Sequence, residues 1–213
     1  MRRLLIVAAL LIPVGMSAQN PPAGQGGQKG AAGAGQAAAP RLTVTTTAFP
    51  DGGEIPARNI SRGGENKSPA FEFKWYTATS PSVPPPAELK TYAVIFHDIE
   101  NSTMRTTADT LHWTAFNIPG TATGIAEGLG PGDLPDGTIN GPGIARRGGS
   151  PGAYYGPGAG PGPFHHYVFE FYALDTKLDL TGAATREELL KAMDGHVIGK
   201  AAYFGRFRAP SLP

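Results

Sequence analysis

The chain has 213 residues, contains no cysteine and carries 18 basic against 17 acidic side chains. The lack of cysteine excludes a disulfide framework, a cysteine-ligated zinc site and a thiol nucleophile. The balanced charge offers no basic excess for a phosphate backbone, so we do not expect nucleic acid as a partner.

The first 18 residues have the pattern of a secretory signal peptide. Arg2 and Arg3 precede an apolar run that begins at Leu4, and the small residues Ser17 and Ala18 follow it. Such a run is too short to span a bilayer comfortably. We therefore expect cleavage near Ala18, a secreted or periplasmic product and no transmembrane span.

The next segment, 19–40, is predicted to be a disordered tether. It consists almost entirely of glycine, alanine, glutamine and proline and has no large apolar side chain to bury. This composition is typical of segments that do not fold. The remainder, 41–213, has a length that suits a single domain with one hydrophobic core.

Strand-like segments then recur, each rich in β-branched and aromatic residues and bounded by glycine, proline, asparagine or serine. They cover 41–49, 71–76, 91–98, 111–118, 166–174 and 200–208. One segment, 185–196, favours a helix, because Thr185 and Glu188 match a capping box and an apolar stripe follows them. These elements predict a mainly β fold of packed antiparallel sheets with a short helix near the C-terminus.

Most of the large aromatic side chains are expected to pack in the core. Trp75, Phe116, Phe169 and Phe204 belong to this group. Trp113 and Phe164 are instead candidates for lining a pocket.

A long loop leads into the most aromatic strand. The region 120–162 is crowded with glycine and proline, and loops of that length are usually functional or disordered. In the following stretch, GPGPFHHYVFEFYALD, alternation places His165, Tyr167 and Phe169 on one face, with His165 and Tyr167 at its rim. Polar groups at the rim of an apolar layer favour a small-ligand pocket. The same pattern also fits a capped strand end whose histidine makes its hydrogen bonds within the protein and binds no ligand.

Five motifs follow one another along 41–208. They are GGENKSPAFEFKW at 63–75, a strand ending in Asp98, LHWTAFNIPG at 111–120, YYGPGAGPGPFHHY at 154–167 and GHVIGKAAYFGRF at 195–207. In this order they resemble the phosphatidylethanolamine-binding protein family, in particular its bacterial Raf-kinase-inhibitor-like branch. The resemblance implies an antiparallel β-sandwich with a small anion-binding pocket.

The resemblance also implies which residues form that pocket. The matching positions are Asp98, His112, Tyr154, Gly156, Gly158, His165 and Tyr167. His166 stands where the family has an arginine outside the pocket. The segment after Asp98 departs from the family's Asp-Pro-Asp-x-Pro pattern, because Ile99 and Ser102 replace the prolines and Glu100 replaces the second aspartate. These replacements remove the residues that would make the turn rigid.

The implied set suits phosphate or carboxylate oxygens, because imidazole, phenol and glycine N–H groups are all hydrogen-bond donors. Asp98 fits such a site as the partner of an imidazole. By accepting from one ring nitrogen, a carboxylate favours the cationic ring, so that the other nitrogen can donate to the ligand. The alternative is a buried aspartate–histidine pair that binds no ligand.

Two other chemistries have less support. Asp98, His112 and His165 are the residue types of a two-histidine, one-carboxylate metal site, but they lack the short spacing of such ligands. A hydrolase would need an activated nucleophile, and the sequence has no Gly-x-Ser-x-Gly elbow. We therefore expect no metal, no cofactor and no catalysis.

The sequence thus predicts a non-catalytic, secreted or periplasmic protein that binds a small anion, such as phosphate or a phosphoethanolamine-like headgroup. A different class of function stays open beside it. In that alternative the protein inhibits a protease or kinase partner through its surface, and the pocket is vestigial.

Overall fold

The computed structural model describes residues 39–102, 106–144 and 151–211. The predicted signal peptide and nearly all of the predicted tether lie outside these residues. The elements are β1 (Arg41–Thr45), β2 (Gly53–Glu54), η1 (Ala57–Asn59), β3 (Phe71–Tyr76), β4 (Thr91–Ser102), β5 (Asp109–Pro119), β6 (Gly124–Ile125), β7 (Ile139–Asn140), β8 (His165–Leu174), α1 (Arg186–Met193) and β9 (Val197–Phe207). Within this part of the chain, no helix is both long and apolar enough to cross a membrane.

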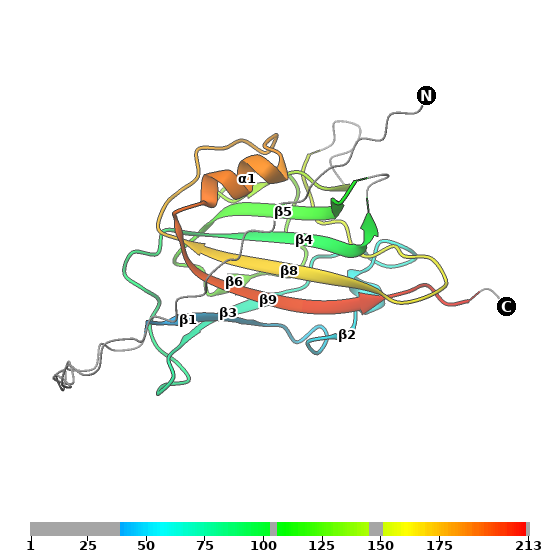
Figure 1. Ribbon diagram of the computed structural model, residues 1–213, viewed down its shortest axis with the longest axis horizontal. Helices are drawn as coiled ribbons and strands as arrows, with labels where there is room; N and C mark the ends of the chain where they lie inside the picture. Colours follow the sequence, from blue (N-terminus) through cyan, green and yellow to red (C-terminus); the bar gives the residue numbers. More distant parts are fainter. Residues whose placement is uncertain (1–38, 103–105, 145–150, 212–213) are drawn as a thin grey trace, which may run out of the picture. The chain divides into compact units, whose positions relative to one another are not determined.

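The strands form two sheets (Figure 1). The larger sheet has the order β2-β9-β8-β4-β5-β7, and the smaller has the order β1-β3-β6. The named strands pair in antiparallel fashion except for the short β2, which runs parallel to β9. The predicted mainly β class and antiparallel sandwich are therefore confirmed, with this one parallel pair at an edge.

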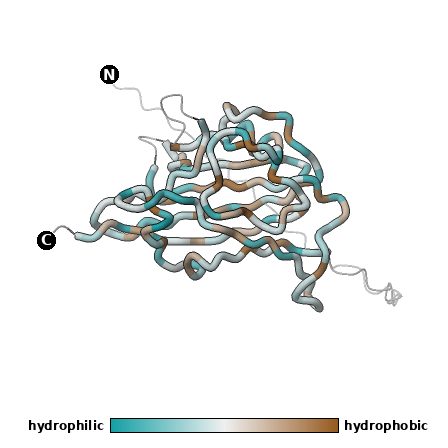
Figure 2. Tube along the Cα trace, turned by 180° about the vertical axis from the view of Figure 1, so that it is seen from behind, coloured by the Kyte–Doolittle hydropathy of each residue, from teal (hydrophilic) through white to brown (hydrophobic). Residues whose placement is uncertain are grey.

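The core has two layers, one on each face of the larger sheet. Between the sheets, aromatic residues such as Phe71, Phe96 and Phe169 form the main cluster. On the opposite face, Ile95 packs with Leu189 of α1 in a second cluster. Because β4 is buried on both faces, its sequence is a nearly continuous apolar run rather than an alternating one. Figure 2 shows the hydrophobic residues along these central strands.

The helix begins where the sequence predicts it. The Thr185 side chain accepts from the backbone N–H of Glu188 at 3.1 Å, and the Glu188 carboxylate accepts from the Thr185 N–H at 2.7 Å. This reciprocal pair satisfies two N–H groups that would otherwise have no partner at the helix start. Gly195, just beyond the helix, has a positive φ of 80°, which glycine adopts without strain.

The predicted core aromatics are confirmed with one exception. Trp75, Phe116 and Phe169 are buried, but the side chain of Phe204 is 42% exposed. The alternation of β9 explains the error, because Tyr203 and Phe207 face the core and Phe204 between them faces outward.

Candidate functional site

A bulge in β5 places the first histidine of the candidate site. Phe96 of β4 pairs with Trp113, and the next residue of β4, His97, pairs with Leu111. His112 is therefore an extra residue on β5 at this point. A bulged residue leaves the regular alternation of the strand, so its side chain can be redirected.

A second irregularity lies at the end of β4. Asp98 pairs with Thr110 and Ser102 with Asp109, so residues 99–101 are extra on β4. The Asp98 carboxylate holds this bulge, because its Oδ1 accepts from the backbone N–H groups of Glu100 and Asn101, both at 3.1 Å. The turn that lacks the family's prolines is thus fixed by side-chain hydrogen bonds.

Asp98 also binds His165, the first residue of β8. Its Oδ2 lies 2.8 Å from Nδ1 of the ring. The aspartate side chain is 3% exposed, whereas the histidine side chain is 31% exposed. Since a carboxylate accepts, Nδ1 of His165 carries a proton, and Nε2 becomes a donor when the ring is cationic.

The His112 ring is oriented by the backbone. Its Nδ1 lies 2.8 Å from the carbonyl oxygen of Tyr155, and a carbonyl only accepts, so this nitrogen also carries the proton. The ring packs against Phe96 and meets Tyr167 edge-on, with 5.3 Å between ring centroids in each case. These contacts fix the orientation of the His112 ring beside Tyr167.

Tyr167 presents an unsatisfied hydroxyl. The residue is fully buried, and its oxygen has no hydrogen-bond partner of good geometry within the described part of the chain. Burial raises the pKa of Tyr167, and the Asp98 carboxylate raises it further, while the nearby backbone N–H groups of Ala159 and Gly158 oppose the increase. The hydroxyl therefore stays protonated and is a donor for whatever occupies the space beside it.

These side chains surround a cavity of about 580 Å³. Its lining residues are Ser61, Arg62, Asp98, Asn101, His112, Ile144, Tyr155, Gly158, Ala159, Gly160, His165 and Tyr167. Five residues of the predicted set, from three strands and the long loop, thus meet at one place. Among the described residues, no group of three or more histidine, aspartate or glutamate side chains could hold a metal ion.

Two residues of the predicted set do not line this cavity. The Tyr154 hydroxyl is buried and donates to the carbonyl of Asn59 at 2.7 Å. The next residue, Tyr155, lines the cavity instead. The N–H of Gly156 donates to the side-chain oxygen of Asn66 at 2.8 Å. A Cβ at Gly156 would lie 2.2 Å from the Asn59 carbonyl oxygen, so glycine here permits close packing of two loops.

Sequence reasoning missed the contribution of the loop at 61–62. The Ser61 hydroxyl is within hydrogen-bond distance of the carbonyls of Gly156 and Pro157, at 2.9 and 3.0 Å. The neighbouring Arg62 is exposed, and its Nη1 lies 3.5 Å from the Gly158 carbonyl. Only the proximity of this loop to 156–160, which no local pattern reveals, identifies it as part of the site.

The two aromatic candidates for the pocket lie elsewhere. Trp113 is fully buried, and its indole N–H donates to the Asn140 side chain at 2.8 Å. Phe164 packs against the guanidinium groups of Arg206 and Arg208, whose central carbons lie 4.6 and 4.3 Å from its ring centroid. Neither lines the cavity.

Comparisons with known proteins agree with this architecture. The family model for phosphatidylethanolamine-binding protein matches residues 45–208. A UPF0098 protein of Methanothermobacter thermautotrophicus is 38% identical over 168 residues, which make up 78% of this chain and 99% of the relative.

Solved structures give the same result. CT736 of Chlamydia trachomatis, a proposed phosphatidylethanolamine-binding protein homologue, is 29% identical with a TM-score of 0.65, over 80% of this chain and 99% of its own. YbcL of E. coli, described as a new member of the mammalian family, is 21% identical with a TM-score of 0.63 over the same shares and supports the fold. From the family model and the archaeal relative together, we conclude that the chain belongs to the phosphatidylethanolamine-binding protein family.

Proposed function

We propose that the protein binds a small anion, phosphate or a phosphorylated group, in the cavity around His165 and does not transform it. The observation that carries the proposal is the hydroxyl of Tyr167, a buried donor that has no partner of good geometry within the described residues. An unsatisfied buried donor is costly. An anionic oxygen in the cavity would satisfy it.

The neighbouring groups support the same ligand class. Asp98 accepts from Nδ1 of His165, so the second ring nitrogen is directed away from the carboxylate. Arg62 also lines the cavity, and its Nη1 lies 3.5 Å from the carbonyl oxygen of Gly158, another lining residue. Charge-assisted hydrogen bonds to an anion are roughly twice as strong as neutral ones.

Binding without catalysis is part of the proposal. Of the described residues that line the cavity, Ser61 has the only alkyl hydroxyl. That hydroxyl is already directed at the two backbone carbonyls of Gly156 and Pro157. A nucleophile would need a base that accepts its proton, and a serine that donates to carbonyls is not activated in this way.

Export from the cytoplasm is also proposed, from the leader pattern at 1–18. Intact-mass analysis of the protein from fractionated cells is the check. A mass that begins near Gln19 in the exported fraction is expected, and a cytosolic protein that retains Met1 would overturn this part of the proposal.

Calorimetric titration tests the binding function. Native protein is expected to bind phosphate, phosphoethanolamine or acetate at millimolar concentration or below. His165→Ala should weaken binding at least about ten-fold, because a hydrogen bond to a charged group contributes about 1.5–3 kcal/mol. His196→Ala is the matched control, because His196 also pairs with an aspartate, Asp175, and lies at the other end of β8 and β9.

Two results would refute the binding function. One is a native protein that binds none of the three anions at millimolar concentration. The other is His165→Ala binding as tightly as the native protein. Either result would leave inhibition through surface contacts as the competing account.

A further inference from the structure

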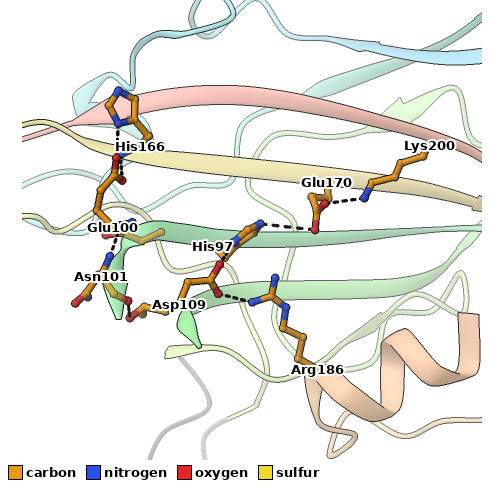
Figure 3. A network of polar contacts seen from close by, with 10 residues as sticks. His97, Glu100, Asn101, Asp109, His166, Glu170, Arg186 and Lys200 are labelled. Carbon is orange, nitrogen blue, oxygen red and sulfur yellow. Dashed lines mark hydrogen bonds and ion pairs between the residues drawn. The ribbon is translucent and has the colours of Figure 1, made fainter. Parts of the chain in front are cut away.

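The bulge 99–101 is tied to β8 by a glutamate–histidine pair outside the cavity. The carboxylate of Glu100 accepts from the backbone N–H of His166 at 2.7 Å and contacts Nδ1 of its ring at 2.5 Å. Figure 3 shows the two side chains facing each other across the strands. Burial raises the pKa of Glu100, but the contacts with His166 outweigh burial, so the net shift is downward. Glu100 does not line the cavity.

The next residue, Asn101, is held on both sides of its backbone. Its N–H donates to Asp98 at 3.1 Å, and its carbonyl accepts from the Thr110 hydroxyl at 2.7 Å. Asn101, with its backbone held in this way, is one of the residues that line the cavity. Its amide group offers two N–H donors in addition to an acceptor.

We propose that Asn101 contacts the bound anion through its side-chain amide and that the Glu100–His166 pair is the positioning device that holds it there. The inference rests on the proposed anion-binding function and adds a specificity residue to it. The pair takes over the part that the missing prolines at Ile99 and Ser102 would play in a rigid turn. The amide favours an anion with an oxygen at this wall of the cavity.

The charge of Glu100 and its proposed positioning role predict opposite effects on anion binding when the carboxylate is removed. A carboxylate near an anion site repels the ligand, so its removal should strengthen binding by a simple Coulomb argument. If Glu100 instead positions Asn101, its removal weakens binding, because the bulge loosens and the amide is no longer held in place. The sign of the change therefore separates the two roles.

The experiment is a double-mutant cycle measured by calorimetry with inorganic phosphate at constant ionic strength. Asn101→Ala should bind phosphate about five-fold more weakly, the value of one typical hydrogen bond. Glu100→Gln, which keeps the shape of the side chain, should also bind about three- to five-fold more weakly. The double variant should bind no more weakly than Asn101→Ala, because the two residues act through one contact.

Asp175→Asn is the matched control. Asp175 forms an exposed carboxylate–histidine pair with His196 at 2.8 Å, away from the cavity, so its removal should leave phosphate affinity unchanged. In the native protein, the side-chain NH₂ resonances of Asn101 should also shift on phosphate addition. This NMR readout does not depend on how well any variant folds.

The outcomes are distinguishable. Native protein that binds no phosphate overturns this inference, and it overturns the proposed function as well if phosphoethanolamine and acetate also fail to bind. If native protein binds and His165→Ala does not, but Asn101→Ala binds normally, this inference alone is wrong. Tighter phosphate binding by Glu100→Gln would overturn the positioning role. So would a double variant whose loss of phosphate affinity equals the product of the two single losses.

Discussion

The hydroxyl of Tyr167 is the single group on which the proposed binding function most depends. A tyrosine so deeply buried would normally direct its oxygen at a partner, as Tyr154 does toward the Asn59 carbonyl. Tyr167 makes no such bond of good geometry within the described residues, although the Asp98 carboxylate and the backbone N–H groups of Gly158 and Ala159 lie near its hydroxyl. The free protein therefore accepts a desolvation cost that a bound anion would repay.

Tyr167→Phe should consequently have opposite effects on stability and on binding. Removing an unsatisfied buried hydroxyl should raise the free energy of unfolding by about 1 kcal/mol. The same change should weaken phosphate binding about five-fold, because one donor is lost. Urea unfolding and phosphate calorimetry on the same preparation measure the two quantities.

Tyr154→Phe provides the comparison for this substitution. Its hydroxyl is hydrogen-bonded, so the variant should be destabilised by about 1 kcal/mol and should bind phosphate normally. A Tyr167→Phe protein that is also destabilised, with unchanged affinity, would show that its hydroxyl has an internal structural role.

The sequence could identify some site residues and not others for local reasons. Asp98 pairs with Tyr167 across β4 and β8, and His165 lies two residues before Tyr167, so alternation and the family resemblance together predict that the three lie close to one another. The choice of Tyr154 over Tyr155 depends on how an irregular loop folds, which has no periodic signal. Arg62 becomes part of the site only through tertiary contact.

At the scale of elements, a polar network crosses the outer face of the larger sheet (Figure 3). His97 of β4 lies between two carboxylates. Its Nδ1 is 2.5 Å from Oδ2 of Asp109 in β5, and its Nε2 is 3.6 Å from Oε2 of Glu170 in β8. Arg186 at the start of α1 binds Asp109, and Lys200 of β9 binds Glu170 at 2.8 Å. The network thus links α1 to four strands of this sheet.

The network predicts how stability depends on pH. The nearby His97 ring, followed by Lys200, lowers the pKa of Glu170 to about 2 despite its partial burial. A carboxyl with a lowered pKa stabilises the folded state above its unfolded pKa, and this contribution is lost as pH falls toward the folded value. Glu170 should therefore contribute up to about 3 kcal/mol at pH 6, lost between about pH 4.5 and 2.

Glu170→Gln tests this contribution. The variant should be less stable than the native protein at pH 6, and the difference should shrink steadily below about pH 4.5. Urea unfolding from pH 6 to the lowest pH at which the protein folds measures it. Glu72→Gln, which removes an exposed ion pair with Lys74, is the control and should have little effect. A constant difference at every pH would contradict the argument.

Element boundaries show where sequence patterns lose their information. The capping box fixed the start of α1 correctly because two side chains define it. The extension of β4 to Ser102 and the bulge at His112 depend on pairing between strands, which no single segment encodes. β2, β6 and β7 have two residues each, too few for a period to appear.

At the scale of the whole molecule, two cavities compete for the role of binding site. The larger, of about 990 Å³, lies beside Ile55, Ile60 and Phe207 and shares Arg62 with the smaller one. Its apolar floor is almost fully buried, and histidine and tyrosine donors are absent from its described lining. The convergence of polar donors, rather than volume, therefore favours the smaller cavity.

The location of phosphate in the native protein tests the central claim most directly. The calorimetric titration, repeated by NMR on labelled protein, reports where the anion binds. We predict saturable shifts at the ring of His165, at Tyr167 and at the backbone amides of Gly158 to Gly160. In His165→Ala, the shifts at Tyr167 and at the backbone amides should be lost. Shifts confined to the larger cavity around Ile55 and Phe207, or no saturable shift at millimolar phosphate, would contradict the claim.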